Sequence, residues 1–164
     1  GEWVSNPQAT WIDLDTDSLF SAGSKGGLAL WDISNPASVP APSTYAVSGT
    51  ESNQFSVLPS SQKVILASIA QTPDFIVLDY SSGALVAGTT HALGYTVSLY
   101  DSIAVDEPNN LLFYLERNYA ANNQHGIHCA DISDLSTNDS MVHLATYTDP
   151  VNTYAISHLT CVPY

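Results

Sequence analysis

IAVDEPNNLLFYLE, at residues 103–116, joins two apolar runs through a short polar turn, and a third run, IHCADIS, follows at residues 127–133. The same three-run phrase occurs twice earlier in the chain. Its first copy reads WIDLD at 11–15, LFSA at 19–22 and LALWDIS at 28–34, and its second reads FSVLP at 55–59, VILAS at 64–68 and FIVLDYS at 75–81. Aspartates close the apolar part of the third runs, 47 and 52 residues apart, at Asp32, Asp79 and Asp131. The chain is therefore built on one repeated unit.

Each unit predicts four β-strands, because short apolar runs alternate with turn residues and no stretch keeps the spacing of an amphipathic helix. We expect strands near 10–15, 18–23, 27–33 and 43–48, near 54–58, 63–69, 74–80 and 84–90, and near 101–105, 111–117, 126–132 and 141–147. A repeat of this length and make-up is typical of a β-propeller blade. The predicted fold class is all-β, with three four-stranded antiparallel blades plus part of a fourth.

The whole chain, residues 1–164, is interpreted as one propeller segment. Its blades span about 9–49, 53–93 and 100–149, and residues 154–164 resemble the start of a fourth blade. Closed propellers typically have 4–8 blades, and an open stack exposes its end faces. We therefore expect the propeller to be incomplete here, or to be completed by assembly. The expected partners are further blades of the same chain or other copies of it.

The second and third strands of each unit are nearly continuous apolar runs, which indicates strands buried on both faces. The aspartate that follows each third run has a structural interpretation. Its carboxylate is expected to accept backbone N–H bonds from the next residues in a turn.

Residues 101–116 resemble the opening of a blade in the YWTD, NHL and gluconolactonase-like group of propellers, where an Ile-Ala-Val-Asp-type strand turns directly into a Leu-Tyr-type strand. Residues 27–40 are similar to LVIVD-type repeats, in which Val-Asp-Ile-Ser-Asp-Pro recurs. These resemblances imply a propeller fold. The gluconolactonase-like resemblance further implies a calcium ion in the central channel, held by acidic and Asn side chains from several blades.

The net charge and the length of the apolar runs each exclude one class of partner. Only three Lys and Arg residues oppose 16 acids, for a formal net charge of −13, so nucleic acid binding is not expected. No apolar run approaches the roughly 20 residues that a membrane-spanning helix needs, so membrane insertion is not expected either. The acidity is interpreted as surface solubility, with attraction for cations as the alternative.

Cys129 and Cys161 are the only cysteines, and two readings stay open for them. They form a disulfide between adjacent blades, as suits an extracellular protein, or they are separate buried thiols. Asn138 begins the glycosylation triplet Asn-Asp-Ser in a polar loop. Together these features predict an extracellular, secreted or cell-surface protein.

Few residues suggest a ligand site. Asp13, Asp15 and Asp17 alternate as in the start of a calcium loop, but a solvated acidic turn is the favoured interpretation, with calcium ligation as the alternative. No cofactor is assigned, and calcium is the one alternative that these carboxylates leave open. Trp3 is the aromatic side chain freest to stack on a sugar ring. The five histidines form no metal or catalytic motif, and no catalytic residue is assigned.

The predicted function is a non-catalytic secreted propeller that acts as a binding or structural assembly module, with carbohydrate or protein as its ligand. The alternative is a metal-dependent propeller hydrolase of the lactonase kind. The binding module is favoured because the acidic residues lie mainly in turns, whereas the hydrolase needs acidic and Asn ligands that converge in the channel.

Overall fold

The computed structural model describes residues 7–23, 27–46, 54–67, 74–93, 103–118 and 124–148. These residues form three four-stranded antiparallel sheets, each with its strands in chain order. The first sheet contains β1 (Pro7–Asp13), β2 (Ser18–Gly23), β3 (Gly27–Asp32) and β4 (Ser43–Tyr45). The second contains β5 (Phe55–Leu58), β6 (Lys63–Ala67), β7 (Phe75–Asp79) and β8 (Val86–His91). The third contains β9 (Ile103–Asp106), β10 (Leu111–Asn118), β11 (Gln124–Asp131) and β12 (Val142–Thr148).

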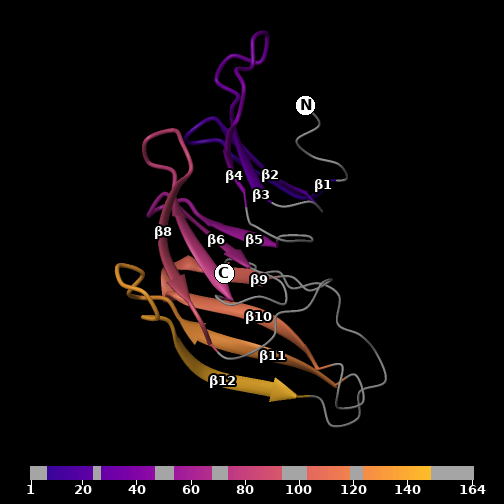
Figure 1. Cartoon of the computed structure of the whole chain (residues 1–164), viewed down its shortest axis with the longest axis vertical. Helices are drawn as coiled ribbons and strands as arrows, with labels where there is room; N and C mark the ends of the chain where they lie inside the picture. Colours follow the sequence, from indigo (N-terminus) through magenta and orange to yellow (C-terminus); the bar gives the residue numbers. More distant parts are fainter. Residues whose placement is uncertain are drawn as a thin grey trace.

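The all-β prediction is confirmed, since the described residues hold a single helical element, the three-residue 3-10 turn Glu107–Asn109. The predicted fourth-blade segment, residues 154–164, lies outside the described residues. In the part of the chain that the structure describes, no helix has the length and apolar character to cross a bilayer. The three sheets follow one another along the long axis of the molecule (Figure 1).

One backbone geometry recurs in all three sheets. The residue directly before the second strand is left-handed in each case, with φ of 50° at Asp17, 52° at Gln62 and 55° at Asn110. Its carbonyl accepts the backbone N–H of the residue that follows the third strand. These bonds run from Ile33 to Asp17 at 2.8 Å, from Tyr80 to Gln62 at 2.9 Å and from Ile132 to Asn110 at 2.9 Å. Each sheet therefore closes its second and third strands in the same way.

The aspartates after the third apolar runs form the expected turns. Their Oδ1 atoms accept the N–H two residues on, over 2.9 Å for Asp32, 2.8 Å for Asp79 and 2.7 Å for Asp131. Hydrogen bonds from the following serine hold the pKa of each carboxyl below its usual value. This prediction is confirmed.

Adjacent sheets pack on each other through two apolar cores. The core between the first and second sheets is built around Phe20, Leu30, Val64, Leu66 and Leu78. The core between the second and third sheets contains Ile65, Ala67, Phe75, Leu112 and Tyr114. Successive side chains of a strand point to opposite faces, so β6 sends alternate residues into each core.

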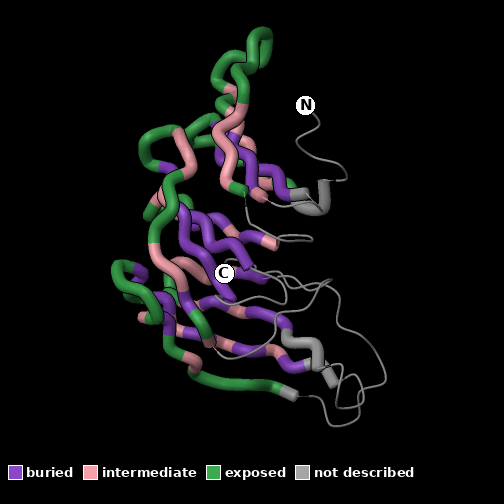
Figure 2. The backbone as a smooth tube through the Cα atoms, in the orientation of Figure 1, coloured by how far each residue is buried: buried purple, intermediate pink, exposed green. Residues whose placement is uncertain are grey.

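Burial follows from this layering. The middle sheet is covered on both sides, and its central strands β6 and β7 are buried along most of their length (Figure 2). The outermost strand of the array, β12, is exposed along most of its length. The nearly continuous apolar runs in the sequence are thus explained by burial on both faces.

Candidate interaction surfaces

The first and second sheets meet through a cluster of aromatic rings centred on Phe20. Phe20 is fully buried, and its ring centroid lies 4.9 Å from that of Tyr80 in an edge-on arrangement. The rings of Trp11 and Phe55 lie 5.9 and 6.3 Å from it. Aromatic pairs at these separations add to the free energy gained from burial of their area.

Among the described residues, one fully buried polar contact crosses this interface, beside a part-buried bond from the Leu85 N–H to the Ser43 hydroxyl at 2.9 Å. The Tyr80 hydroxyl donates to Oδ2 of Asp13 over 3.1 Å. Asp13 is 4% exposed and also accepts bonds from the Asp15 N–H at 3.0 Å and the Thr16 hydroxyl at 2.7 Å. Burial raises the pKa of Asp13, but the bonds from Thr16, Asp15 and Tyr80 outweigh it and hold this pKa below the usual value. The carboxylate is therefore charged and committed to the turn and to the neighbouring sheet.

The three predicted calcium ligands differ in their exposure to solvent. Asp15 and Asp17 are exposed in the turn, whereas Asp13 is buried. Among the described residues, no group of three or more His, Cys, Asp or Glu side chains is placed to hold a metal ion. Calcium ligation by Asp13, Asp15 and Asp17 thus stays a prediction without support from the geometry of this turn.

The second and third sheets meet through polar loops in addition to their apolar core. The Glu107 carboxylate accepts bonds from the Ser60 N–H at 3.2 Å and from the Ser61 N–H at 3.1 Å. Further out, Oδ1 of Asn138 accepts the Thr90 N–H over 3.0 Å. These contacts join turns of the third sheet to strands and turns of the second.

The next residue of the loop completes this attachment. The Asp139 N–H donates to the Thr90 carbonyl over 2.9 Å, and Oδ1 of Asp139 accepts the Ala92 N–H over 2.8 Å. Asn138 itself is exposed, so its side-chain nitrogen lies in a loop that the solvent reaches. Glycosylation of Asn138 stays a prediction.

Histidines are buried at this second interface. His91 is fully buried on β8, with Nε2 at 2.9 Å from the Thr89 hydroxyl and Nδ1 accepting the Met141 N–H over 3.4 Å. Burial lowers the pKa of His91, although Asp139 and Asp134 act in the opposite direction. On the third sheet His128 is 1% exposed and stacks on Tyr114, with ring centroids 4.9 Å apart. No local motif surrounds either histidine, so nothing in the sequence marks the two positions as buried.

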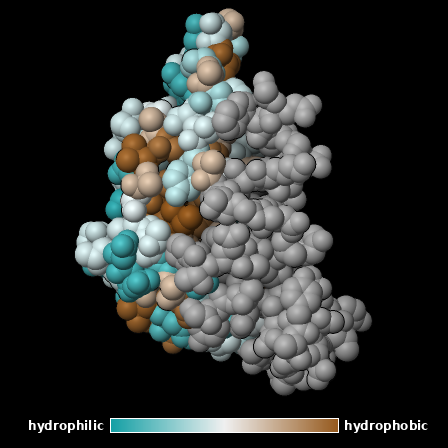
Figure 3. Space-filling model, in the orientation of Figure 1, coloured by the Kyte–Doolittle hydropathy of each residue, from teal (hydrophilic) through white to brown (hydrophobic). Residues whose placement is uncertain are grey.

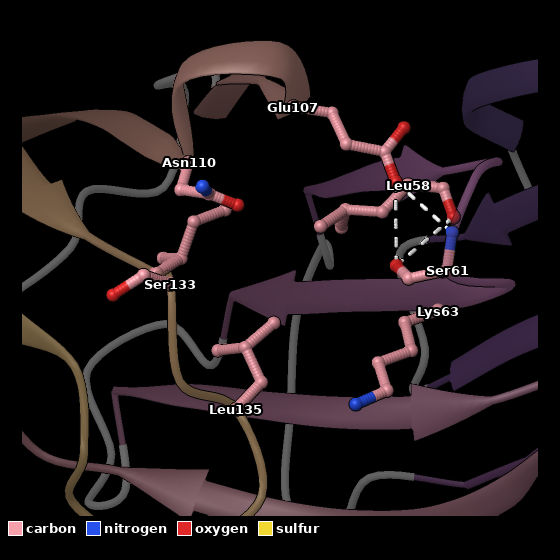
Figure 4. A pocket seen from close by; sticks show the side chains of 8 residues that line it. Leu58, Ser61, Lys63, Glu107, Asn110, Ser133 and Leu135 are labelled. Carbon is pink, nitrogen blue, oxygen red and sulfur yellow. Dashed lines mark hydrogen bonds between the residues drawn. The ribbon is translucent and has the colours of Figure 1, made fainter.

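A small cavity lies at the edge of the same interface. Its volume is about 140 Å³, below the roughly 300 Å³ at which ligand pockets begin. Glu107 turns toward Ser61 on one side, and Lys63 extends on another (Figure 4). The Glu107 carboxylate already accepts three hydrogen bonds from Ser60 and Ser61. It therefore links the second and third sheets and is not free to bind a ligand in the cavity.

The first sheet carries an apolar row on its outer face. Ile12, Leu19 and Trp31 lie opposite one another in register on β1, β2 and β3. Their neighbours Trp11 and Phe20 point into the core with the second sheet, so this row points away from it. Ile12 is 52% exposed, and Leu19 and Trp31 are half-buried. We call this set the leading face.

The third sheet has a matching surface at the other end of the array. Leu112 and Tyr114 point into the core with the second sheet, so the alternate positions of β10 point away from it. Two rows in register lie on that outer face, Ala104, Phe113, Cys129 and Ala145 in one, and Leu115, Ile127 and Tyr147 in the other. We call these residues the trailing face.

Exposure on the trailing face rises toward the edge strand. Leu115 is buried, Phe113 and Ile127 are half-buried, and Tyr147 on β12 is 62% exposed. Elsewhere, on the described part of the face seen in Figure 3, exposed apolar side chains form separate small patches among polar ones.

Cys129 lies on the trailing face as a half-buried free thiol whose pKa is raised by burial and by Asp131. Its predicted partner, Cys161, lies outside the described residues, as does Trp3. The disulfide and the sugar-stacking role therefore stay predictions.

No protein-family model matches this chain, and no curated protein matches it either.

Proposed function

We propose that the three sheets are consecutive blades of a β-propeller. The recurrent left-handed residue before each second strand and the shared bond to the residue after each third strand support this. The in-order antiparallel strands and the stacking of sheets along one axis support it too.

The face positions correspond from sheet to sheet when the closing aspartates are aligned. Ile76 and Leu78, three and one residues before Asp79, point toward the first sheet. The equivalent positions of the first sheet, before Asp32, are Ala29 and Trp31, and Trp31 belongs to the leading face. The leading face thus occupies the positions that bury a blade against its predecessor.

The same alignment explains the trailing face. Phe75 and Val77, four and two residues before Asp79, point toward the third sheet. Their equivalents before Asp131 are Ile127 and Cys129. Both ends of the array therefore carry, on the same strands, the side chains that form interfaces inside it. This correspondence is the observation that carries the proposal.

From it we derive the function: a non-catalytic assembly and binding module whose end faces are covered by further blades, from the same chain or from a second copy. The exposed Asn138 and the acidic surface suit an extracellular location, which is part of the proposal. Protein is the favoured ligand, since the two faces that carry the argument are sheet faces of the kind that pack on other sheets.

Sedimentation equilibrium of the 164-residue chain at micromolar concentration tests the proposal. We expect a weight-average mass that rises with concentration above the 17.5 kDa of one copy. Ile12→Asp places a charge on the leading face and should lower association at least about tenfold, because an unpaired buried charge opposes packing.

Val39→Asp is the matched control. It makes the same charge change at a residue that is 45% exposed in the β3–β4 connection, outside the strands that form the leading and trailing faces. It should associate like the parent chain. A folded monomer at all concentrations, or equal effects of the two substitutions, would overturn the proposal.

A further inference from the structure

Three side-chain atoms of the third sheet form a compact triangle. Nδ1 of His128 lies 3.3 Å from Nε2 of His143, and the Thr146 hydroxyl oxygen lies 3.1 Å from the first and 2.9 Å from the second. His128 lies on β11, and the other two residues lie on β12. Two imidazoles and a hydroxyl thus converge from adjacent strands.

A one-residue bulge brings these groups together. His128 pairs with Thr146 and Cys129 with Ala145, but Ala130 pairs with His143, so Leu144 is an extra residue in β12. In a regular strand His143 and Thr146, three positions apart, would point to opposite faces. The bulge turns His143 to the side of Thr146, as bulges do when they re-aim a side chain.

The bulge also occurs in the second sheet, but the histidines do not. There Ile76 pairs with Thr90, whereas Leu78 pairs with Ala87, which is the same one-residue shift. Aligned on this shift, Ile76 stands where the third sheet has His128, and Ala87 stands where it has His143. Packing of this fold therefore does not require imidazoles at the two positions. Their presence in the third sheet alone calls for a separate reason.

The triangle has the dimensions of one face of a metal coordination shell. Two nitrogen ligands at about 2.0–2.1 Å from an ion lie about 3.3–3.4 Å apart at a tetrahedral angle and about 2.8–3.0 Å apart at a right angle. The three observed separations, 2.9, 3.1 and 3.3 Å, fall at or between these limits.

The surroundings hold the site in place and leave it open. The His128 ring is fixed by its stack on Tyr114, with 13° between the planes. His143 is half-buried and Thr146 is exposed, so an ion reaches the triangle from solvent. The net charge of −13 raises the local concentration of cations around the molecule.

We infer that His128, His143 and Thr146 form a binding site for one divalent transition-metal ion. Imidazole nitrogens suit Zn²⁺, Cu²⁺ and Ni²⁺, whereas Ca²⁺ and Mg²⁺ prefer oxygen ligands. Nδ1 of His128 and Nε2 of His143 are the primary ligands, the Thr146 hydroxyl is the third, and water fills the remaining position. This site lies on the adjacent strands β11 and β12 of the third sheet and is separate from the Asp13 turn of the first sheet.

Titration calorimetry with Zn²⁺ and electron paramagnetic resonance with Cu²⁺ test the inference on the whole chain. The parent should bind one equivalent, and its Cu²⁺ spectrum should show coupling to two imidazole nitrogens. His143→Ala removes a primary ligand, so it should weaken binding by at least the roughly 10–100-fold that loss of an outer-shell partner costs, and should leave coupling to one nitrogen. His91→Asn, which removes the other described buried histidine, is the control and should bind like the parent.

A second measurement needs no variant. Zn²⁺ should shift the imidazole ¹⁵N resonances of His128 and His143 and leave those of His91 unchanged. Absence of saturable binding in the parent, or equal binding by the parent and His143→Ala, would overturn the inference. Equal losses in His143→Ala and His91→Asn, or Zn²⁺-induced shifts at His91 alone, would overturn it as well.

Discussion

The interface between the first and second sheets and the interface between the second and third sheets are stabilised by different kinds of contact. Between the first and second sheets, three aromatic rings pack around Phe20, and one buried bond joins Tyr80 to Asp13. Between the second and third sheets, buried imidazoles at His91 and His128 share the interface with polar loop contacts. Because burial lowers the pKa of His91, mild acid should weaken the second interface, whereas the first should weaken only at the lower pH where Asp13 takes up its proton.

The largest expected effect is at the aromatic interface. Phe20→Ala removes the ring that contacts Trp11, Phe55 and Tyr80, and leaves a cavity in a fully buried position. We expect the free energy of unfolding to fall by about 3–5 kcal/mol, measured by denaturant titration. Phe20→Leu should recover much of the loss. Equal stability of Phe20→Ala and the parent would contradict the account of this interface.

The polar contact of the same interface comes next. Asp13→Ala leaves the Tyr80 hydroxyl without its acceptor and should cost about 1–3 kcal/mol in denaturant titration. Asp32→Ala is the matched control, because the Asp32 carboxylate is exposed and accepts the Ser34 N–H within its own turn. It should cost clearly less. Equal costs would show that the turn, rather than the link between sheets, carries the effect.

The stability conferred by Asp13 also has a pH dependence of known sign. Its pKa in the folded chain lies below the ordinary value of 3.8, so the unfolded chain takes up its proton first as pH falls. The contribution of Asp13 is therefore complete above about pH 5 and is lost as pH drops through the folded pKa. Asp13→Asn should flatten the acid limb of the stability profile in this range.

At the second interface, His91 sets a different pH window. Burial lowers its pKa below 6.5 in the folded chain, so the unfolded chain binds the proton first. The free energy of unfolding should then fall as pH drops below about 6.5, and His91→Asn should remove that part of the slope. Hydrogen exchange should open β8 in this window before it opens β3. A free energy of unfolding that stays constant between about pH 7.5 and 5.5 would contradict the expected pH sensitivity of the second interface.

The smallest effect is expected at the loop. Asp139→Ala removes the acceptor of the Ala92 N–H at an exposed position and should cost about 0.5–1 kcal/mol. Protection of the Ala92 amide in hydrogen exchange is the direct readout. Full retention of that protection in Asp139→Ala would show that the loop is held by its other bonds.

Much of this architecture follows from local patterns. The apolar runs and the turn residues between them predicted all twelve strands to within a few residues. The clearest runs are the second and third strands of each sheet, because strands buried on both faces carry mostly apolar side chains. The turns after Asp32, Asp79 and Asp131 could also be predicted from the sequence, since an Asx turn forms between residues that are close in the chain.

The contacts between sheets were not predictable in the same way. Asp13 and Tyr80 are 67 residues apart, and only the stacking of sheets makes them meet. The approach of His143 to His128 depends on a bulge at Leu144 that no local residue preference announces. An alignment of the three units strand by strand shows that only the third unit has histidines at these two positions, on its third and fourth strands. A search for local motifs does not make this comparison.

The central claim is that the leading face of one copy packs on the trailing face of another as adjacent sheets do here. Its most direct test is crosslinking between Ile12→Cys and the native Cys129, with Cys161→Ser in the background and a short bifunctional maleimide as the reagent. The account predicts dimers and longer chains for Ile12→Cys, and few of them for Val39→Cys in the same background. Equal yields from both, or only single copies from both, would contradict it.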